Sequence, residues 1–409
     1  MALLRVENLY KIFGPRPKAA LKMAQDGKSK PEILEATGCT LAINDATFEI
    51  NKGETFVVMG LSGSGKSTVL RCLNRLWEPT YGSIKLGDDD IVTMDEEKLR
   101  QIRRTKMNMV FQHFGLLPHR TVSDNVAFGL EIQLVNPAKR REKAYETIKM
   151  VGLEGYEEMM TGELSGGMQQ RVGLARALAT DPDILLMDEA FSALDPLIRS
   201  QMQDELLDLQ QEVQKTIVFI THDLDEALKL GDRIAIMKDG AIVQIGTPEE
   251  ILTDPADEYV SSFVQNVDRS KVITASTLMF DHPSRVVSPK EGPEVAIRRM
   301  RKVGISTLAL TGKNKSFEGF VRIDDCVELQ NKRDGRSLEH IALTDVPKAH
   351  PDTPVVDLLP HVMESRLPIA VVNDKGQLEG LVMRASIVAE IMGQDGLNGE
   401  AEKEVVEND

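Results

Sequence analysis

Cysteine and aromatic residues are scarce in this chain of 409 residues. The three cysteines, Cys39, Cys72 and Cys326, lie far apart and form neither a Cys-x-x-Cys pair nor a Cys/His cluster. This pattern argues against a disulfide framework and against a structural zinc site. Aromatic residues make up only 4% of the chain and the formal net charge is -15. Stacking platforms and a basic surplus are what a protein uses to hold nucleic acid, so we expect no nucleic-acid partner.

Long apolar runs are also missing. No stretch reaches the roughly 18 apolar residues that a membrane-spanning helix needs. The first residues, MALLRVENLYKIF, carry charges at Arg5, Glu7 and Lys11 and do not resemble a secretory signal. If the protein works at a membrane, we expect another chain to supply the spans.

The first two thirds of the chain alternate between strand and helix patterns. Apolar runs typical of buried strands occupy residues 54–60, 183–189, 216–222 and 233–240. Helical patterns occupy residues 67–77, 167–180 and 198–213. Such alternation predicts an α/β fold with a mostly parallel sheet covered by helices. A lysine-rich stretch at 15–38 interrupts the pattern, and we expect one or two short helices there, outside the main sheet.

A different pattern begins near residue 276. Helix, strand, turn and strand follow one another twice, with Gly319 and Gly380 in equivalent places. This is an internal repeat of a small α/β unit, and neither copy can bury its apolar face alone. We therefore expect a first domain at 1–265, a linker at 266–275, two repeats at 276–338 and 339–398, and an acidic tail at 399–409.

The stretch GLSGSGKS at 60–67 fits the pattern G-x-x-x-x-G-K-[ST] and lies between a predicted strand and a predicted helix. Glycines permit the tight turn, backbone N–H groups face phosphates, Lys66 adds a positive charge, and Ser67 offers its hydroxyl to Mg²⁺. The motif predicts a site for the phosphates of a nucleotide. Its expected residues are Gly60, Leu61, Ser62, Gly63, Ser64, Gly65, Lys66, Ser67 and Thr68.

A second stretch, ILLMDE at 184–189, is an apolar strand that ends in two acids. Asp188 is placed to hold Mg²⁺, directly or through water, and Glu189 is placed to polarise an attacking water molecule. Two acids at a solvated strand edge are the alternative. The four apolar residues before them and the glycine-rich loop upstream favour the catalytic interpretation.

Three more motifs complete a recognisable order: LSGGMQQ at 164–170, SALD at 192–195 and THD with His222. Together with the two stretches above, they have the order and approximate spacing of ABC-type ATPases, so residues 1 to about 265 resemble that P-loop domain. The segment LSGGMQQ is close to the family signature LSGGQ and departs from it by Met168.

The resemblance implies how the motifs work. In this family two ATPase domains associate head to tail, so a second copy would complete each ATP site in trans through Ser165, Gly166, Gly167, Gln169 and Asp195. It also implies that Gln112 joins Mg²⁺ and the attacking water to the transmembrane partner and that His222 contacts the γ-phosphate. With Lys66 and Glu189 these two are the expected catalytic residues, and the expected Mg²⁺ ligands are Ser67, Gln112 and Asp188.

The residue that stacks on adenine is less well defined. Phe13 in YKIFG stands where the family often places an aromatic ring on adenine. The stretch 15–38 separates it from the glycine-rich loop, and Tyr10 is the competing candidate.

Within the family the chain is most similar to the ATPase subunits of glycine betaine/proline importers. The resemblance rests on ILEATGCTLAINDATFEI at 33–50, on LLMDEAFSALDPLIRSQMQDEL at 185–206 and on the repeats. It implies an ATP-hydrolysing subunit that energises uptake of a compatible solute. It also implies a peripheral location on the cytoplasmic face of a bacterial inner membrane, with permease subunits and, indirectly, an extracytoplasmic substrate-binding protein as partners.

The repeats resemble a tandem pair of CBS domains, which implies a regulatory role. Their ligand is open between an adenine nucleotide and anionic lipid. Asp325 fits the acid that holds a ribose in the first copy, whereas Ser386 stands there in the second. RRMRK at 298–302 is the candidate basic patch for lipid or a phosphate-bearing ligand.

Two other classes of protein stay open. A soluble ABC protein that works on nucleic acid would usually carry two ATPase cassettes or a long coiled-coil insertion, and this sequence has neither. A nucleotide-sensing module without turnover agrees with the repeats but not with an intact Glu189.

Overall fold

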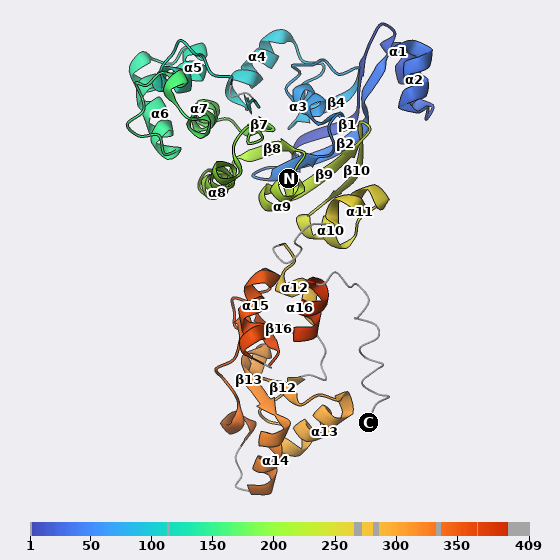
Figure 1. Ribbon diagram of the computed structural model, residues 1–409, viewed down its shortest axis with the longest axis vertical. Coiled ribbons are helices and arrows are strands. Elements are labelled where there is room, and N and C mark those ends of the chain that lie inside the picture. Colours follow the sequence, from blue (N-terminus) through green and yellow to red (C-terminus); the bar gives the residue numbers. More distant parts are fainter. Residues whose placement is uncertain are drawn as a thin grey trace. The chain divides into compact units, whose positions relative to one another are not determined.

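The computed structural model describes residues 2–112, 115–265, 272–280, 286–332, 337–365 and 367–391. The chain divides into two compact units, residues 1–267 and 268–409, and each is described by itself (Figure 1). The acidic tail predicted at 399–409 and most of the predicted linker lie outside the described residues.

A six-stranded sheet forms the centre of the first unit, in the order β10-β9-β3-β8-β7-β6. Its strands are β3 (Thr55–Met59), β6 (Met107–Val110), β7 (Ile184–Asp188), β8 (Thr216–Thr221), β9 (Arg233–Lys238) and β10 (Ala241–Gly246). Only β10 runs antiparallel to its neighbour. Every residue of β3, β7 and β8 is buried, which explains their unbroken apolar sequences. The predicted parallel α/β fold is confirmed.

A second, antiparallel sheet has the order β2-β1-β4-β5. Its strands are β1 (Ala2–Phe13), β2 (Thr40–Asn51), β4 (Tyr81–Leu86) and β5 (Asp89–Asp90). Buried side chains of this sheet, of the central sheet and of α3 (Lys66–Leu73) form one core, which includes Val6, Ile43, Phe56, Leu70 and Leu186. The loop between β3 and α3 is therefore anchored on both sides.

The stretch at 15–38 forms two short helices, α1 (Pro17–Gln25) and α2 (Lys30–Thr37), as expected. Ser29 begins α2 with a capping box, since its N–H and hydroxyl both donate to the Glu32 carboxylate at 2.8 Å. Gly38, with φ 67°, ends the helix. Ile33 is buried against β1 and β2 in a small core. The α1–α2 pair therefore has a fixed place beside the antiparallel sheet.

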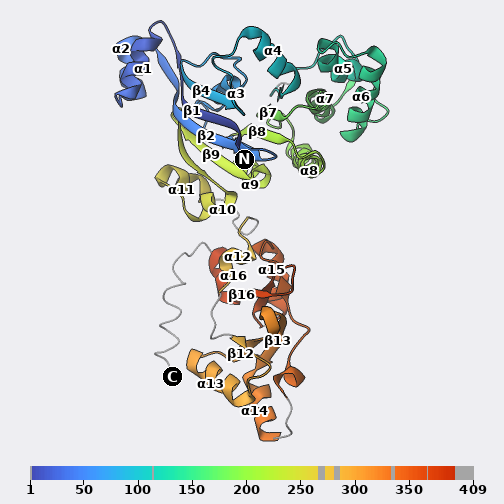
Figure 2. The same ribbon diagram turned by 180° about the vertical axis from the view of Figure 1, so that it is seen from behind.

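Three of the remaining helices of the first unit form a packed group, which Figures 1 and 2 show from opposite sides. Helices α5 (Val122–Ile132), α6 (Pro137–Met150) and α7 (Gly166–Leu178) pack against one another. The others are α4 (Glu96–Thr105), α8 (Pro196–Val213), α9 (Leu224–Leu230), α10 (Pro248–Thr253) and α11 (Glu258–Val264). Within the described ranges, no helix combines the length and apolarity that crossing a bilayer requires.

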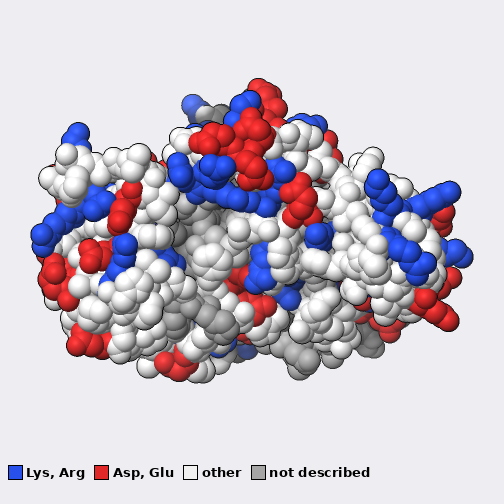
Figure 3. Space-filling view, turned by 90° about the horizontal axis from the view of Figure 1, so that it is seen from above, with Lys and Arg blue, Asp and Glu red and all other residues white. Residues whose placement is uncertain are grey.

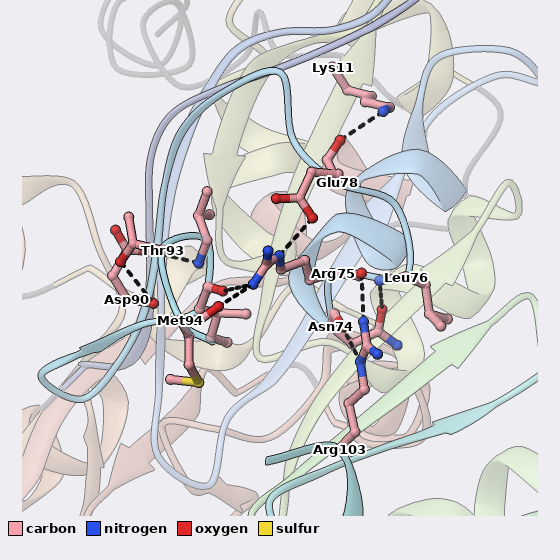
Figure 4. A network of polar contacts seen from close by, with 11 residues as sticks. Lys11, Asn74, Arg75, Leu76, Glu78, Asp90, Thr93, Met94 and Arg103 are labelled. Carbon is pink, nitrogen blue, oxygen red and sulfur yellow. Dashed lines mark hydrogen bonds and ion pairs between the residues drawn. The ribbon is translucent and has the colours of Figure 1, made fainter. Parts of the chain in front are cut away.

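The end of α3 is held by a polar network (Figure 4). The Arg75 guanidinium donates to the Met94 carbonyl at 2.6 Å and pairs with Glu78 at 2.7 Å. The Arg103 guanidinium of α4 donates to the carbonyls of Asn74 and Arg75 at 2.9 and 2.6 Å. These carbonyls lie just beyond the last turn of α3, so α4 and the chain before it fix the far end of this helix.

The second unit contains two three-stranded sheets of the same topology, a parallel pair followed by an antiparallel pair. The strands are β11 (Val286–Val287), β12 (Thr307–Thr311), β13 (Phe317–Arg322), β14 (Lys348–Ala349), β15 (Ile369–Val372) and β16 (Leu378–Val382). The helices are α13 (Pro293–Val303), α14 (Ile323–Lys332), α15 (Val355–Glu364) and α16 (Arg384–Ile391). Gly319 lies opposite Leu310 and Gly380 opposite Val371, and a bulge follows each pair. The predicted equivalence of the two glycines is confirmed.

The two repeats bury their sheets together. Ala309 and Phe320 of the first form one cluster with Ala370, Leu378 and Leu381 of the second. The segments that lead into the repeats are exchanged. Residues of 273–279, which include α12 (Ala275–Leu278), belong to the core of the second repeat, whereas η5 (Leu338–Ile341) packs on that of the first.

Candidate active site

A cavity of about 580 Å³ lies over the loop between β3 and α3. This volume is in the usual range for small-molecule sites. Its lining combines residues of the predicted ATP loop with Glu189 and with residues of α2 and β2. The lining residues are Lys30, Pro31, Leu34, Thr40, Leu41, Ala42, Ser62, Gly63, Gly65, Lys66, Ser67, Thr68 and Glu189.

Two glycines let the loop pass close to other backbone. Gly60 has φ 149°, and a Cβ there would stand 2.3 Å from the Met237 carbonyl oxygen. Gly65 has φ 107°, and a Cβ there would stand 2.5 Å from the Ala42 carbonyl oxygen. Any other residue would clash with fixed backbone at these points. The loop therefore wraps at the N-terminus of α3, where backbone N–H groups favour an anion.

Lys66 lies at the first position of α3 and is only 5% exposed. Its ammonium donates to the carbonyls of Gly60 and Leu61 at 2.9 and 3.1 Å. Burial lowers the pKa of Lys66, and the nearby carboxylates of Glu189 and Asp188 partly oppose that effect. The positive charge is thus held within the loop.

Ser67 and Asp188 meet although they are far apart in the sequence. The Ser67 hydroxyl donates to the Asp188 carboxylate at 2.9 Å, and Arg71 pairs with the same carboxylate at 3.3 Å. Ser67 lines the cavity, and its hydroxyl beside a buried carboxylate suits Mg²⁺, which takes one or two protein oxygens together with phosphate and water. The described residues hold no group of three or more His, Cys, Asp or Glu side chains suited to a metal. The Ser67 hydroxyl and the Asp188 carboxylate are oxygen ligands of the kind that fit Mg²⁺.

Three predicted catalytic side chains meet where β6, β7 and β8 end. Glu189 Oε2 lies 3.4 Å from Gln112 Nε2 and 3.4 Å from His222 Nδ1. The Glu189 side chain is 19% exposed, whereas that of His222 is 58% exposed. Neighbouring parallel strands end at one edge of a sheet, which explains why three distant motifs converge. A carboxylate between an amide and an imidazole can orient a water molecule.

The signature loop, LSGGMQQ at 164–170, does not reach this cavity within one chain. Among the described residues, none of 164–170 lines it. Ser165 begins α7, and its hydroxyl accepts from the Met168 N–H at 3.3 Å. Asp195 begins α8 in the same way, accepting from the Ile198 N–H at 3.1 Å. Ser165, Gly166 and Asp195 are exposed, so they face outward.

The signature loop and the SALD segment also touch each other. A Cβ on Gly167 would stand 2.7 Å from Ile198, and one on Gly166 would stand 3.8 Å from Leu194. The two loops thus form one surface. The Gln169 amide instead donates to the carbonyls of Thr161 and Leu164 at 3.1 and 3.2 Å. This side chain bonds within its own subdomain.

Neither candidate for the adenine contact lines the cavity. The Phe13 ring packs edge-on against Trp77 at 5.1 Å between centroids, and the Lys11 ammonium lies 4.7 Å from its centre. Tyr10 is only 6% exposed and packs beside Tyr81. Tyr10 therefore has no free ring face for a base.

The sequence alone did not point to Arg71 or to the wall of α2. Arg71 lies five residues after Lys66 on α3, a spacing that could have suggested a second basic residue near the carboxylate. Lys30, Pro31 and Leu34 carry a helix-start signal but no chemical motif. Their place in the cavity depends on tertiary structure.

A second hollow, of about 330 Å³, separates α4 and β6 from α5 and α7. Its apolar lining includes Met109, Phe111, Leu117, Phe128 and Ile132. Phe111 directly precedes Gln112, so the hollow adjoins the catalytic cluster. Figure 3 shows acidic and basic side chains gathered over the middle of the face seen from above, beside uncharged hollowed surface.

The second unit has its own cavity, of about 460 Å³, between the two repeats. Arg299 lines it and pairs with Glu291 at 2.7 Å. The proposed basic patch at 298–302 therefore does not present four equivalent charges: Arg298, Arg301 and Lys302 are exposed, whereas Arg299 is engaged in this ion pair.

Asp325 does not line this cavity and pairs instead with Arg322 at 3.2 Å. Ser386 is buried at 8% exposure and also lies outside the lining.

Comparison with known proteins agrees with this geometry. Residues 43–192 match the family described as ABC transporter, and residues 338–393 match the CBS domain. The chain is 51% identical over 392 residues to the glycine betaine transport ATP-binding protein OpuAA of Bacillus subtilis (strain 168), covering 96% of this chain and 93% of that protein. It is 47% identical over 398 residues to the glycine betaine/proline betaine transport system ATP-binding protein ProV of Escherichia coli (strain K12), covering 97% and 98%.

A solved structure extends the comparison to an assembly. The dimeric post-hydrolysis state of the ATP-binding cassette MJ0796, bound to ADP and Pi, aligns with a TM-score of 0.51 and 32% identity. The match covers 60% of this chain and 98% of that one. The loop at 60–68, the acids Asp188 and Glu189 and the outward-facing signature loop thus occur in a chain that is 51% identical to a relative over nearly its whole length. This chain belongs to the ABC transporter family, as an ATP-binding subunit whose C-terminal unit contains a CBS domain.

Proposed function

We propose that this chain is the ATP-hydrolysing subunit of an importer for glycine betaine, proline betaine or a related quaternary amine. The observation that carries the ATPase part is the cluster of Gln112, Glu189 and His222 beside Ser67 and Asp188. The substrate class rests on two relatives, of 51% and 47% identity, whose names specify glycine betaine transport.

The chemistry is phosphoryl transfer to water. The loop N–H groups and Lys66 hold the phosphates, and Ser67 and Asp188, with Gln112, hold the metal. When bound, Mg²⁺ neutralises charge that develops on the phosphate oxygens. Glu189 accepts a hydrogen bond from the attacking water and orients it, and His222 lies next to it for contact with the γ-phosphate.

A second copy completes the site. Ser165 and Gly166 face outward at the start of α7, and Asp195 faces outward beside them. In a two-fold pair each copy presents this surface to the cavity of the other. The dimeric arrangement of the MJ0796 cassette supports this proposal. Gly167 and Gln169 shape the loop, Gln169 by holding it to Thr161 and Leu164.

The membrane partner is a permease, and its contact is the hollow beside Gln112. Phe111 and Ile132, each 40% exposed, give this hollow an apolar surface. Phe111 directly precedes Gln112, which contacts Glu189. A movement of Phe111 in the hollow is therefore transmitted to the catalytic side chains. The chain accordingly sits on the cytoplasmic face of the bacterial inner membrane, and an extracytoplasmic binding protein delivers the solute.

The C-terminal unit regulates this activity. Its cavity between the repeats is large enough for an adenine nucleotide. The alternative ligand is anionic lipid, which would bind the exposed side chains of Arg298, Arg301 and Lys302.

Reconstitution tests the proposed function. We expect proteoliposomes with this chain, its permease and the binding protein to accumulate glycine betaine only when ATP is inside, and glycine betaine to stimulate ATP hydrolysis. A control with Lys66→Ala should show neither activity. Import of an unrelated solute without import of any quaternary amine would contradict the substrate class while leaving the ATPase intact.

A further inference from the structure

The last helix that the structure describes in the first unit, α11, contacts the loop between β3 and α3 through one side chain (Figure 1). The Tyr259 hydroxyl donates to the Met237 carbonyl at 3.3 Å, and it accepts a hydrogen bond from the backbone N–H of Leu61. Leu61 belongs to the loop, and Met237 belongs to β9. One hydroxyl therefore ties α11 to both.

The Met237 carbonyl lies against the start of the loop. A Cβ on Gly60 would stand 2.3 Å from its oxygen. Just beyond β9, the Gly240 N–H donates to the Ser64 carbonyl at 2.9 Å. The end of β9 thus supports the loop from behind at two places, and Tyr259 is bonded to the first of them.

The segment of the loop that contacts Tyr259 also holds Lys66. The Lys66 ammonium donates to the carbonyls of Gly60 and Leu61 at 2.9 and 3.1 Å. Leu61 is therefore bonded on both sides, by its carbonyl to Lys66 and by its N–H to Tyr259. A change in the position of α11 would move the peptide groups to which the lysine is bonded.

Tyr259 is itself held in place. Its ring packs edge-on against Phe263 at 5.0 Å between centroids, and the Lys238 ammonium lies 4.5 Å from the ring centre. Val260 and Val264 of the same helix are buried. Burial is the main cause that raises the pKa of Tyr259, so the hydroxyl keeps its proton at neutral pH and can donate and accept at the same time.

Helix α11 is also next to the second unit along the chain. It ends at Val264, and the first unit ends at residue 267. A pull that the second unit exerts through the covalent chain therefore reaches α11 before it reaches the rest of the first unit.

We propose that Tyr259 is a positioning residue that couples α11, and through it the second unit, to the phosphate-binding loop. This inference rests on the proposed ATP hydrolysis, and it deepens the proposed regulation by naming the contact that transmits it. Coupling between two sites is reciprocal. A helix that influences how the loop binds phosphates is therefore itself stabilised when phosphates bind.

Removing the hydroxyl alone tests the coupling in the full-length chain assembled with its permease. Tyr259→Phe keeps the ring contacts and loses both hydrogen bonds. We expect the KM for ATP to rise about fivefold, the usual effect of about one lost hydrogen bond between neutral groups. The value of kcat should change less than about twofold, because the residues around the attacking water are untouched.

Tyr156→Phe is the matched control, since it removes the hydroxyl of an exposed tyrosine outside α11, and it should leave KM unchanged. The division between KM and kcat separates positioning from stability. A variant that had only lost stability would contain less active protein, which lowers the apparent kcat and leaves KM where it was.

Hydrogen–deuterium exchange of the full-length chain measures the reciprocal effect. We expect saturating Mg·ADP to slow amide exchange in residues 258–264 of the unaltered chain and of Tyr156→Phe by about fivefold, and to leave it unchanged in Tyr259→Phe. An unchanged KM in Tyr259→Phe would overturn the inference, and so would protection of α11 that persists in this variant. If the unaltered chain hydrolysed no ATP and bound no ADP, the proposed function itself would be wrong, and the inference would fall with it.

Discussion

Glu189 occupies a backbone conformation that few residues other than glycine adopt. Its φ is 46°, in the left-handed region, and its N–H donates to the Ile220 carbonyl at 3.1 Å. Such a conformation costs on the order of 1–3 kcal/mol and persists where surrounding structure enforces it, often at functional sites. Here it turns the chain sharply after β7, so that consecutive acids serve different purposes: Asp188 meets Ser67, and Glu189 meets Gln112 and His222.

Replacing Glu189 by Gln should slow ATP hydrolysis about 10²-fold to 10⁴-fold, because the amide cannot accept the proton of the attacking water. Nucleotide binding should persist, since the phosphate contacts are made by other residues. Single-turnover hydrolysis and equilibrium ATP binding measure the two effects. Glu97→Gln, on the exposed side of α4, is the control and should hydrolyse normally. Turnover near the unaltered rate in Glu189→Gln would remove this residue from its role.

Glu226 is a buried acid outside the catalytic cluster. It is 6% exposed, and its carboxylate accepts a hydrogen bond from Gln203 at 3.0 Å. Burial is the main cause that raises the pKa of Glu226, while the bonds from Thr221 and Gln203 partly lower it. The folded state therefore holds this proton more tightly than the unfolded state.

The sign of the pH effect follows. Stability from Glu226 is complete below the ordinary glutamate pKa and declines as pH rises towards the raised pKa of the folded state, by about 1.4 kcal/mol for each unit of the shift. Glu226→Gln should remove that decline. The difference in unfolding free energy between variant and unaltered chain, measured with urea at pH 5 and pH 8, should grow with pH in favour of the variant. A difference that stays constant or shrinks would contradict the assignment.

At the scale of the elements, the two ends of α3 have different roles. Its N-terminus faces the cavity, and the chain just beyond its C-terminus is held by Arg103 of α4 (Figure 4). Arg103 also lines the hollow assigned to the permease. A single side chain thus links that hollow to the helix that begins with Lys66.

Arg103→Met should lower the free energy of unfolding by about 1–3 kcal/mol, since it leaves two carbonyls without their charged donor. Arg100→Met is the matched control on the same helix. Arg100 makes an exposed ion pair with Glu97, and its loss should cost less than about 0.5 kcal/mol. Urea titration of both variants checks the contrast, and equal losses would show that the two carbonyl bonds contribute nothing special.

Sequence patterns located most of these elements but not all of their contacts. The buried strands and the loop at 60–67 were predictable because each has a local signature: an unbroken apolar run, or glycines before Lys66 and Ser67. The capping box at Ser29 also marks α2. No local pattern could show where α2 packs. Its place beside β1 and β2, and therefore which of its side chains line the cavity, depends on residues far away in the sequence. The pairing of Tyr10 with Tyr81 of β4 and the contact of Phe13 with Trp77 also have no local sequence pattern.

At the scale of the whole molecule, the two units have separate cores. The first contains all the residues proposed for ATP hydrolysis, and the second contains the basic side chains at 298–302. Three exposed charges near an anionic surface would together contribute about 3 kcal/mol, and this attraction fades over a Debye length of about 8 Å at physiological salt. Such a contribution is large enough to shift a regulatory equilibrium as the ionic strength changes.

Cutting the chain after residue 270 should leave an active ATPase whose coupling to transport no longer responds to ionic strength. Uptake by proteoliposomes containing anionic lipid, measured over a range of internal salt, checks this expectation. The full-length triple variant Arg298→Gln, Arg301→Gln and Lys302→Gln separates the charges from the rest of the unit: it should lose the salt response as the truncation does. A salt response that survives the truncation would rule out this role for the second unit.

The exchange of leading segments between the two repeats has a consequence for how the repeats evolve. Ile273 and Ala275 complete one core and Leu338 completes the other, so neither half of the pair is a self-sufficient piece of protein. A gene rearrangement that duplicated, deleted or transplanted a single repeat would leave both halves unfinished. We therefore expect evolution to move this pair between proteins as an indivisible cassette, with its breakpoints before residue 272 and beyond α16.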